Sequence, residues 1–195
     1  LFPIRIILTS RFNIPTSFDE DSESLVFLEN ISNYLSKYNI RHWISSGTFL
    51  SLYRDNCFFS WDEDIDIDID AKDFDYNRFC ELMRKKGFIL FKTMQKHGKV
   101  VQVIFRHPLQ KRLVDFYIWY EDEHEFYSYC DVGKLYYTKS MIENLIQVNF
   151  RHATLPCPNP EEYFSLRYGE DWRTPKKVSG LPGGGWEITK NLIRG

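Results

Sequence analysis

The clearest pattern of polar and apolar residues is a strict alternation from Asp64 to Asp70, which reads Asp-Ile-Asp-Ile-Asp-Ile-Asp. A period of two predicts a β-strand, because successive side chains of a strand point to opposite faces. Ile65, Ile67 and Ile69 are therefore expected in a core, and the aspartates on the opposite face. Asp is a poor strand former, and neighbouring carboxylates on one face repel each other. A strand that accepts both costs is expected to hold a cation, most naturally Mg²⁺, which prefers oxygen ligands.

The remaining apolar pattern alternates between helical and extended periods. Apolar residues at three- and four-residue steps, as in Leu25, Leu28, Ile31 and Leu35, predict an amphipathic helix. Helices are expected at about 19–38, 48–53, 73–86, 140–145 and 159–168. Strands are expected at about 42–45, 64–70, 88–94, 99–106, 112–119 and 125–130, with an extended segment at 146–155.

This order of elements predicts an α+β fold with a mixed β-sheet flanked by helices. A chain of 195 residues favours one domain over residues 1–195. Within it, 1–18 is expected to form an N-terminal arm and 176–195 a loop-like tail.

Composition removes several classes of function. The net charge of −2 gives no support for nucleic-acid binding. No apolar run approaches the length of about 20 residues that spans a bilayer. The four cysteines form no Cys-x-x-Cys pair, so a zinc knuckle is not expected.

Three interpretations of the acidic strand compete. A solvated edge strand is one, although edges usually carry Lys or mixed charges. An EF-hand loop is another, but its sixth position, which requires Gly, would be Ile69. The third is a metal site for phosphoryl transfer, in which Asp64 and Asp66 share a divalent ion with a carboxylate from another strand. Asp115, a lone acid in an apolar strand, is the natural third ligand; alternatively it caps a turn or pairs with an Arg.

A turn of small residues precedes this strand. Ser46-Gly47-Thr48 lies between a predicted strand and a predicted helix. Backbone N–H groups and hydroxyls at such a turn can face a phosphate. The alternative is an ordinary strand-to-helix turn, since no complete P-loop is present.

Two groups of motifs resemble the LicD family, a nucleotidyltransferase-fold family that includes bacterial phosphocholine transferases and animal fukutin and fukutin-related proteins. The first group is Gly47-Thr48-Phe49-Leu50, then Arg54, then Trp61-Asp62-Glu63-Asp64-Ile65-Asp66-Ile67, continued by Asp73-Phe74-Asp75-Tyr76. The second is Pro158-Asn159-Pro160-Glu161-Glu162-Tyr163 with Tyr168-Gly169-Glu170-Asp171-Trp172-Arg173-Thr174-Pro175. Together the motifs span about residues 38–175 in the family's order.

The resemblance implies roles for individual residues. Asp64, Asp66 and Asp115 would hold Mg²⁺, or alternatively Mn²⁺, and Asp62 would be a further ligand or a polar support. The resemblance also implies that Gly47 and Thr48 contact the donor phosphates.

Arg54 is expected to neutralise phosphate charge, a task suited to a forked cation; otherwise it pairs with Asp55 or Glu63. The chain departs from the family pattern at Arg151 and His152, which replace a small-residue turn and are candidates for substrate contact. It also carries additional acids, Asp68 and Asp70, which are expected either to bind a second ion or to be solvated.

By resemblance, the function is Mg²⁺-dependent transfer of a substituted phosphate, such as phosphocholine, a phospho-alditol or a sugar phosphate. The implied partners are a CDP-linked or similar nucleotide donor and a glycan hydroxyl. The implied compartment is the cytoplasm for a bacterial protein and the Golgi lumen for a eukaryotic one. Two alternatives are a metal- or nucleotide-binding domain without catalysis and a nucleotidyltransferase for another small substrate.

Overall fold

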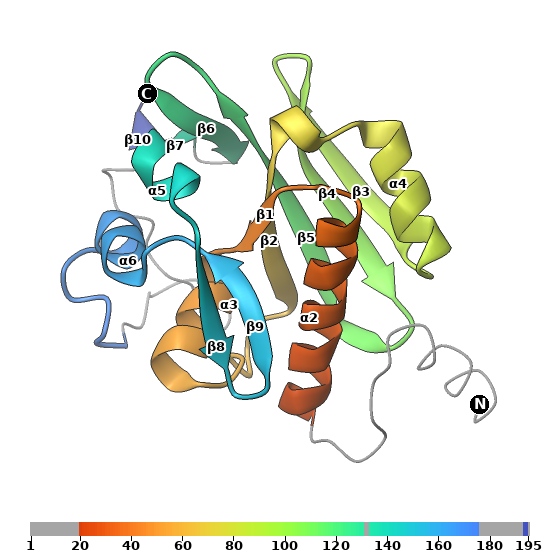
Figure 1. The fold of residues 1–195 in the computed structure, drawn as a ribbon, viewed down its shortest axis with the longest axis horizontal. Helices are drawn as coiled ribbons and strands as arrows, with labels where there is room; N and C mark the ends of the chain where they lie inside the picture. The colour runs from red at the N-terminus through yellow and green to blue at the C-terminus, as the bar shows by residue number, and fades with distance from the viewer. Residues whose placement is uncertain (1–19, 131–132, 176–192, 195) are drawn as a thin grey trace.

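A computed structural model describes residues 20–130, 133–175 and 193–194. Its main body is a sheet of eight strands (Figure 1). The strands are β1 (His42–Ile44), β2 (Asp64–Asp70), β3 (Ile89–Lys96), β4 (Lys99–His107), β5 (Gln110–Glu121), β6 (Glu125–Cys130), β7 (Gly133–Thr138) and β10 (Ile193–Arg194). The helices are α2 (Glu20–Lys37), α3 (Ser46–Leu50), α4 (Tyr76–Lys85), α5 (Lys139–Glu143) and α6 (Pro160–Tyr168). A π-helical turn (Ser51–Asp55) and a 3₁₀ turn (Ala71–Asp73) complete them, and β8 (Ile146–Phe150) and β9 (Ala153–Cys157) form a separate hairpin.

The sheet is mixed, which confirms the predicted fold class. β2 runs parallel to β5, and the other pairs of strands are antiparallel. β5 is the central strand, because β2, β4 and β6 all pair with it. The acidic strand is thus an interior strand, paired with β1 on one side and β5 on the other. This excludes the edge-strand and EF-hand interpretations of residues 64–70.

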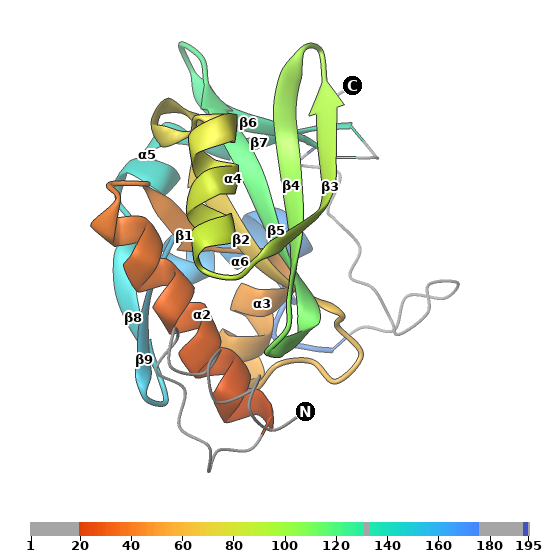
Figure 2. The ribbon, with the colours of Figure 1, turned by 90° about the vertical axis from the view of Figure 1, so that its right-hand side faces the viewer.

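The two faces of β2 carry different side chains, isoleucines on one and aspartates on the other. Ile65, Ile67 and Ile69 are at most 1% exposed and belong to the main apolar core. Figure 2 shows α2 and α4 against one face of the sheet. In that layer Phe79 of α4 packs edge-on against Phe116 of β5, with ring centroids 5.0 Å apart. The aspartates project from the other face, as the alternation predicts, and α3 packs close to β2.

Most predicted elements are present with shifted ends. The helix expected at 48–53 is shorter and continues as the π-helical turn, and the segment expected to be extended at 146–155 folds back on itself as the β8–β9 hairpin. The strand β7 was missed, since it begins with Gly133 and Lys134 and only a short apolar run follows them. The arm expected at 1–18 lies outside the described residues, as does most of the tail at 176–195. Ile193 and Arg194 are described, and they form β10 against β7, so the loop-like prediction is wrong for these two residues. Among the described residues, no helix has the length and apolar character required to cross a bilayer.

Candidate metal and phosphate site

The parallel pairing of β2 with β5 brings three carboxylates together. Asp66 lies directly opposite Asp115 in the register. Asp64 lies two residues earlier on β2, so its side chain points to the same face. Carboxylate oxygens of Asp64, Asp66 and Asp115 all lie within 4.8 Å of one another. Three carboxylates at such separations are the oxygen-rich ligand set that Mg²⁺ and Mn²⁺ prefer.

Asp115 is built into the sheet with one oxygen free to bind a ligand. It is 4% exposed, and its Oδ2 accepts a hydrogen bond of 2.6 Å from Nε2 of Gln102 on β4. Its Oδ1 is buried and has no hydrogen-bond partner among the described residues. Since an unpaired buried carboxylate oxygen is costly, a cation at this position would compensate it. The residues present therefore fit a divalent metal ion.

Burial and mutual repulsion raise the pKa values of the clustered acids. Burial, followed by the negative charge of Asp64, raises the pKa of Asp115 to about 7. Burial and the neighbouring charges of Asp64, Asp62 and Asp115 raise the pKa of Asp66 well above its usual value. The pKa of Asp62 rises to about 8, mainly through burial and through its hydrogen bond and repulsion with Asp64. The group is thus electrostatically strained as long as no cation balances it.

Gly47 sits so close to Asp62 that no larger residue fits without displacement. A Cβ atom at Gly47 would lie 2.5 Å from Oδ2 of Asp62 and 3.8 Å from Oδ2 of Asp66. The backbone of the Ser46 turn is therefore in close contact with the carboxylate of Asp62. This contact explains physically why glycine precedes Thr48 at this turn.

Thr48 supports the acidic strand directly. Its side chain is fully buried, and its Oγ1 accepts a hydrogen bond of 2.9 Å from the backbone N–H of Asp66. The backbone N–H of Ser45 donates to the carbonyl oxygen of Asp66 at 3.3 Å. The turn is thereby fixed against β2 at the position of the carboxylate cluster.

Asp68 and Asp70 are also buried, but each has its own partners. Asp68 accepts hydrogen bonds from Nε1 of Trp43 at 3.0 Å and from Oγ of Ser45 at 2.8 Å. Burial nonetheless raises the pKa of Asp68 to about 6. Asp70 pairs with Nζ of Lys72 at 2.9 Å and with the guanidinium of Arg41 at 3.5 Å. These two acids therefore serve the packing of β2 rather than the three-carboxylate cluster.

A buried arginine that the sequence interpretation missed lies behind the turn. Arg167 of α6 is 9% exposed and donates to Oγ of Ser46 at 2.9 Å and to the hydroxyl of Tyr137 at 2.8 Å. The hydroxyl of Tyr163 accepts from the backbone N–H of Ser46 at 2.8 Å and from the hydroxyl of Tyr137 at 3.2 Å. The positive charge of Arg167 also lowers the pKa of Asp68, opposing the effect of burial.

This network clamps the Ser46 turn to the C-terminal motif of the family resemblance. The motif was noticed, but Arg167, which directly precedes Tyr168, was not. Its signal in the sequence is weak, because an Arg within an amphipathic helix is usually solvated. Gln102 was also missed, although a polar residue between Val101 and Val103 is the same kind of signal that identified Asp115.

Arg54 lies at the end of the π-helical turn and pairs with its neighbour in the sequence. Its Nε and Nη2 donate to the two carboxylate oxygens of Asp55, each at 2.8 Å. Its Nη1 also donates to the carbonyl oxygen of Trp172 at 3.4 Å. The alternative pairing with Asp55 is thus present, and phosphate binding by Arg54 remains a prediction.

Arg151 and His152 form the exposed turn between β8 and β9. There Nη1 of Arg151 donates to Oγ of Ser22 on α2 at 3.5 Å. The described contact of Arg151 is therefore with α2, and substrate contact by either residue remains a prediction.

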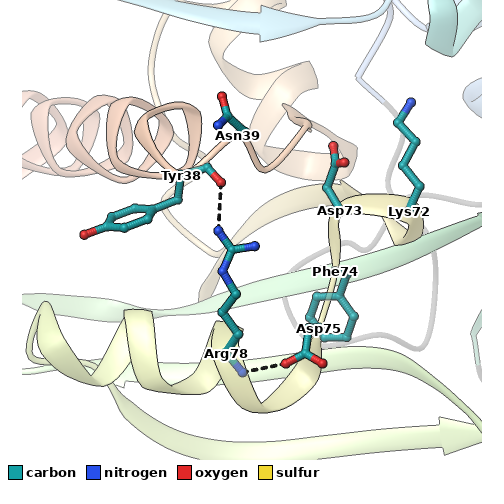
Figure 3. Close-up of a pocket in the computed structure, with 7 residues that line it drawn as sticks. All are labelled: Tyr38, Asn39, Lys72, Asp73, Phe74, Asp75 and Arg78. Atoms are coloured by element: carbon teal, nitrogen blue, oxygen red, sulfur yellow. Dashed lines mark hydrogen bonds between the residues drawn. The ribbon is translucent and has the colours of Figure 1, made fainter.

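A polar pocket lies past the opposite end of β2 from Asp64. Its volume is about 340 Å³ and it lies where the end of α2 meets the start of α4 (Figure 3). The residues that line it are Tyr38, Asn39, Lys72, Asp73, Phe74, Asp75 and Arg78. Figure 3 shows Arg78 bridging the two helices, with its guanidinium donating to the carbonyl oxygen of Tyr38 and its backbone N–H to Asp75. None of the three clustered carboxylates lines this pocket.

Comparison with known proteins identifies the region that contains the cluster. A model of the nucleotidyltransferase domain described as LicD/FKTN/FKRP matches residues 39–160, which include Gly47 and all three clustered aspartates. No curated protein matches the chain significantly. A similar solved structure is that of an antigenic nucleotidyltransferase-like protein from Paracoccidioides brasiliensis, at 14% identity and a TM-score of 0.41. That match covers 74% of this chain and 64% of the other, so the chain spans less than two thirds of that protein.

Proposed function

This chain belongs to the LicD/FKTN/FKRP nucleotidyltransferase family, and we propose that it transfers a substituted phosphate from a CDP-linked donor to a glycan hydroxyl. The family supports the broader class of transferase. The observation that carries the narrower proposal is the meeting of Asp64, Asp66 and Asp115 across two parallel strands, with a buried oxygen of Asp115 that lacks a partner. A set of acids that repel one another suits a site that receives a cation together with an anionic substrate.

The three carboxylates hold the metal in this proposal. A bound Mg²⁺ would supply neutralisation of charge on the reacting phosphate. Gln102 keeps the Asp115 carboxylate oriented through its hydrogen bond to Oδ2, which leaves Oδ1 directed to the ligand. Thr48 holds the backbone of Asp66 and so fixes the position of that carboxylate.

Asp62 is the residue to which we assign proton transfer. Its carboxylate lies beside Asp64 and close to the Gly47 turn, so it is placed within the site, and a bound cation would favour the ionised form that accepts a proton. The hydroxyl oxygen of the acceptor forms a bond to the phosphorus of the transferred group, and its proton passes to the carboxylate of Asp62. The bond between that phosphorus and the bridging oxygen breaks, and CMP leaves with the bonding electrons.

The donor phosphates are assigned to the side of the site formed by the Ser46 turn. Gly47 offers a backbone without a side chain beside Asp62 and Asp66. Arg167 adds positive charge behind the turn. Arg54 would contribute further charge after exchange of its Asp55 partner for a phosphate.

Release of CMP from CDP-linked compounds tests this proposal. CDP-choline, CDP-ribitol and CDP-glycerol would each be incubated with the chain, glycan acceptors and Mg²⁺, with a parallel thermal-shift measurement. The expected result is a Mg²⁺-dependent thermal shift with one CDP compound and release of CMP. Pyrophosphate release from a nucleoside triphosphate would favour a nucleotidyltransferase. A thermal shift without turnover of any donor would favour a binding domain.

A further inference from the structure

Three consecutive apolar side chains are exposed at the start of β3. Ile89 is 59% exposed, Leu90 46% and Phe91 47%. In the described part of the chain only two other large apolar residues, Tyr53 and Ile146, are comparably exposed, at 38% and 40%, and both are isolated in the sequence. Isolated exposed apolar residues are ordinary, whereas a group of them indicates an interaction surface. Ile89 and Leu90 point to opposite faces of β3, so the group flanks the free edge of the strand from both sides.

Cations surround this apolar group. The segment reads Arg84-Lys85-Lys86-Gly87-Phe88-Ile89-Leu90-Phe91-Lys92, with four cations and no acid, and one of the four, Lys85, pairs with Glu81 at 2.7 Å. Arg106 lies opposite Ile89 in the strand register, and its guanidinium lies 4.0 Å from the centroid of the Phe91 ring. The protein as a whole is slightly acidic, so this concentration of positive charge is local. We call residues 84–92 together with Arg106 the basic apolar edge.

The basic apolar edge lies at the outer edge of the sheet. Figure 2 shows the chain leaving the end of α4 and entering β3, the outermost strand on that side. Within the described residues β3 pairs only with β4, and its register shifts between Leu90 and Lys92. We propose that this edge docks the protein on the surface of an anionic lipid bilayer, with Ile89, Leu90 and Phe91 entering the interface and the cations contacting lipid phosphates.

Charge favours a lipid surface over a second copy of the chain. A two-fold interface through β3 would bring identical patches together. The cations of the two edges, Lys92 and Arg106 among them, would then be brought together, and like charges at a strand interface repel. Anionic headgroups instead complement Arg84, Lys92 and the neighbouring cations, and apolar side chains between basic residues are the pattern of an interfacial anchor.

The position of Lys92 connects the edge to the carboxylate cluster. Lys92 lies opposite Ile104, Ile104 opposite Asp115, and Asp115 opposite Asp66, so these residues form one row across four strands. The row has three inter-strand steps of about 4.8 Å each. The docked edge would therefore hold the carboxylate-bearing face beside the bilayer. The docking itself does not depend on the proposed reaction.

Vesicle co-sedimentation of the full chain tests the docking. Vesicles of phosphatidylcholine alone would be compared with vesicles that also contain phosphatidylglycerol. We expect binding only to the anionic vesicles, with a loss of affinity at high salt. The variant Ile89→Ser/Leu90→Ser/Phe91→Ser is expected to bind at least about tenfold more weakly. Lys92→Glu, which keeps the apolar residues, is expected to weaken binding by about 30-fold, because the reversal changes the charge of the edge by two units.

Matched controls lie elsewhere on the surface. Ile146→Ser removes a similarly exposed apolar side chain, and Lys37→Glu reverses an exposed charge, and both are expected to leave binding unchanged. Absence of binding by the unchanged chain would overturn the proposal. So would equal losses in the control variants, or a dimer in sedimentation velocity that the β3 variant dissociates.

Discussion

Asp66 and Asp115 stand directly opposite each other on adjacent parallel strands, although 48 residues separate them in the chain. Both side chains are at least nine-tenths buried, and both carboxyl pKa values are raised by burial and by neighbouring acids. A protein that keeps two buried acids side by side gains stability from whatever cation binds between them. The predictions below follow from this relationship and from the residues that surround it.

Removing the charge of Asp66 is expected to lower activity but to raise stability in the absence of metal. Asp66→Asn is expected to lower transfer by more than about 100-fold, because a metal ligand is lost. In the absence of metal the same variant is expected to melt higher, by about 2–4 °C for each kcal/mol of repulsion removed. Turnover and differential scanning fluorimetry measure the two effects. A variant with full activity would show that Asp66 is not a ligand.

Stability without metal is expected to fall as pH rises. Asp115 and Asp62 have pKa values of about 7 and about 8 in the folded chain, against 3.8 for the unperturbed group. Between about pH 4 and about pH 8 the folded state binds more protons than the unfolded state, so its advantage decreases with pH. Thermal melts with a chelator across this range measure the slope. Mg²⁺ is expected to raise Tm most at the upper end, and a pH-independent Tm would contradict the account.

Gly47→Ala tests the close approach between the turn and Asp62. The new Cβ would collide with Oδ2 of Asp62 and displace that carboxylate. We expect turnover to fall by about 10- to 100-fold because proton transfer is misaligned, and donor KM to rise because Gly47 also lies on the proposed donor side. Gly98→Ala is the matched control. It is strained by its positive φ of 73° but has open space around it, so it should cost about 1 kcal/mol of stability and leave turnover intact.

Arg167 supports both the fold and the turn. Arg167→Met removes the guanidinium that donates hydrogen bonds to the hydroxyls of Ser46 and Tyr137. It also removes the positive charge that lowers the pKa of Asp68. The free energy of unfolding is expected to fall by about 3–5 kcal/mol, as for other broken buried ionic groups. Arg173→Met removes an exposed pair with Glu161 and should cost no more than about 1 kcal/mol. Urea denaturation distinguishes the two, and equal costs would refute the buried network.

The alternation of Asp and Ile was sufficient to predict the acidic strand, its core face and its ligand face. Asp115 was found as the one acid in an apolar strand. The register that places it opposite Asp66 was not predictable, because it depends on how β2 and β5 align over a long connection. Arg167 was missed because an Arg in an amphipathic helix is usually solvated, and Gln102 was missed although it carries the same signal as Asp115, a polar residue in an apolar strand. Likewise, the alternation made Asp68 and Asp70 look equivalent to Asp64 and Asp66, and only their neighbours Trp43, Ser45, Lys72 and Arg41 distinguish them.

The central claim is that Asp64, Asp66 and Asp115 bind one divalent cation. A titration with Mn²⁺, followed by the loss of its solution EPR signal and reversed by competition with Mg²⁺, measures this binding directly. Asp122→Asn, which changes an exposed acid in the turn between β5 and β6, is the control. The account predicts one site in the unchanged chain and in Asp122→Asn, and its loss in Asp115→Asn. Undiminished binding by Asp115→Asn would contradict it.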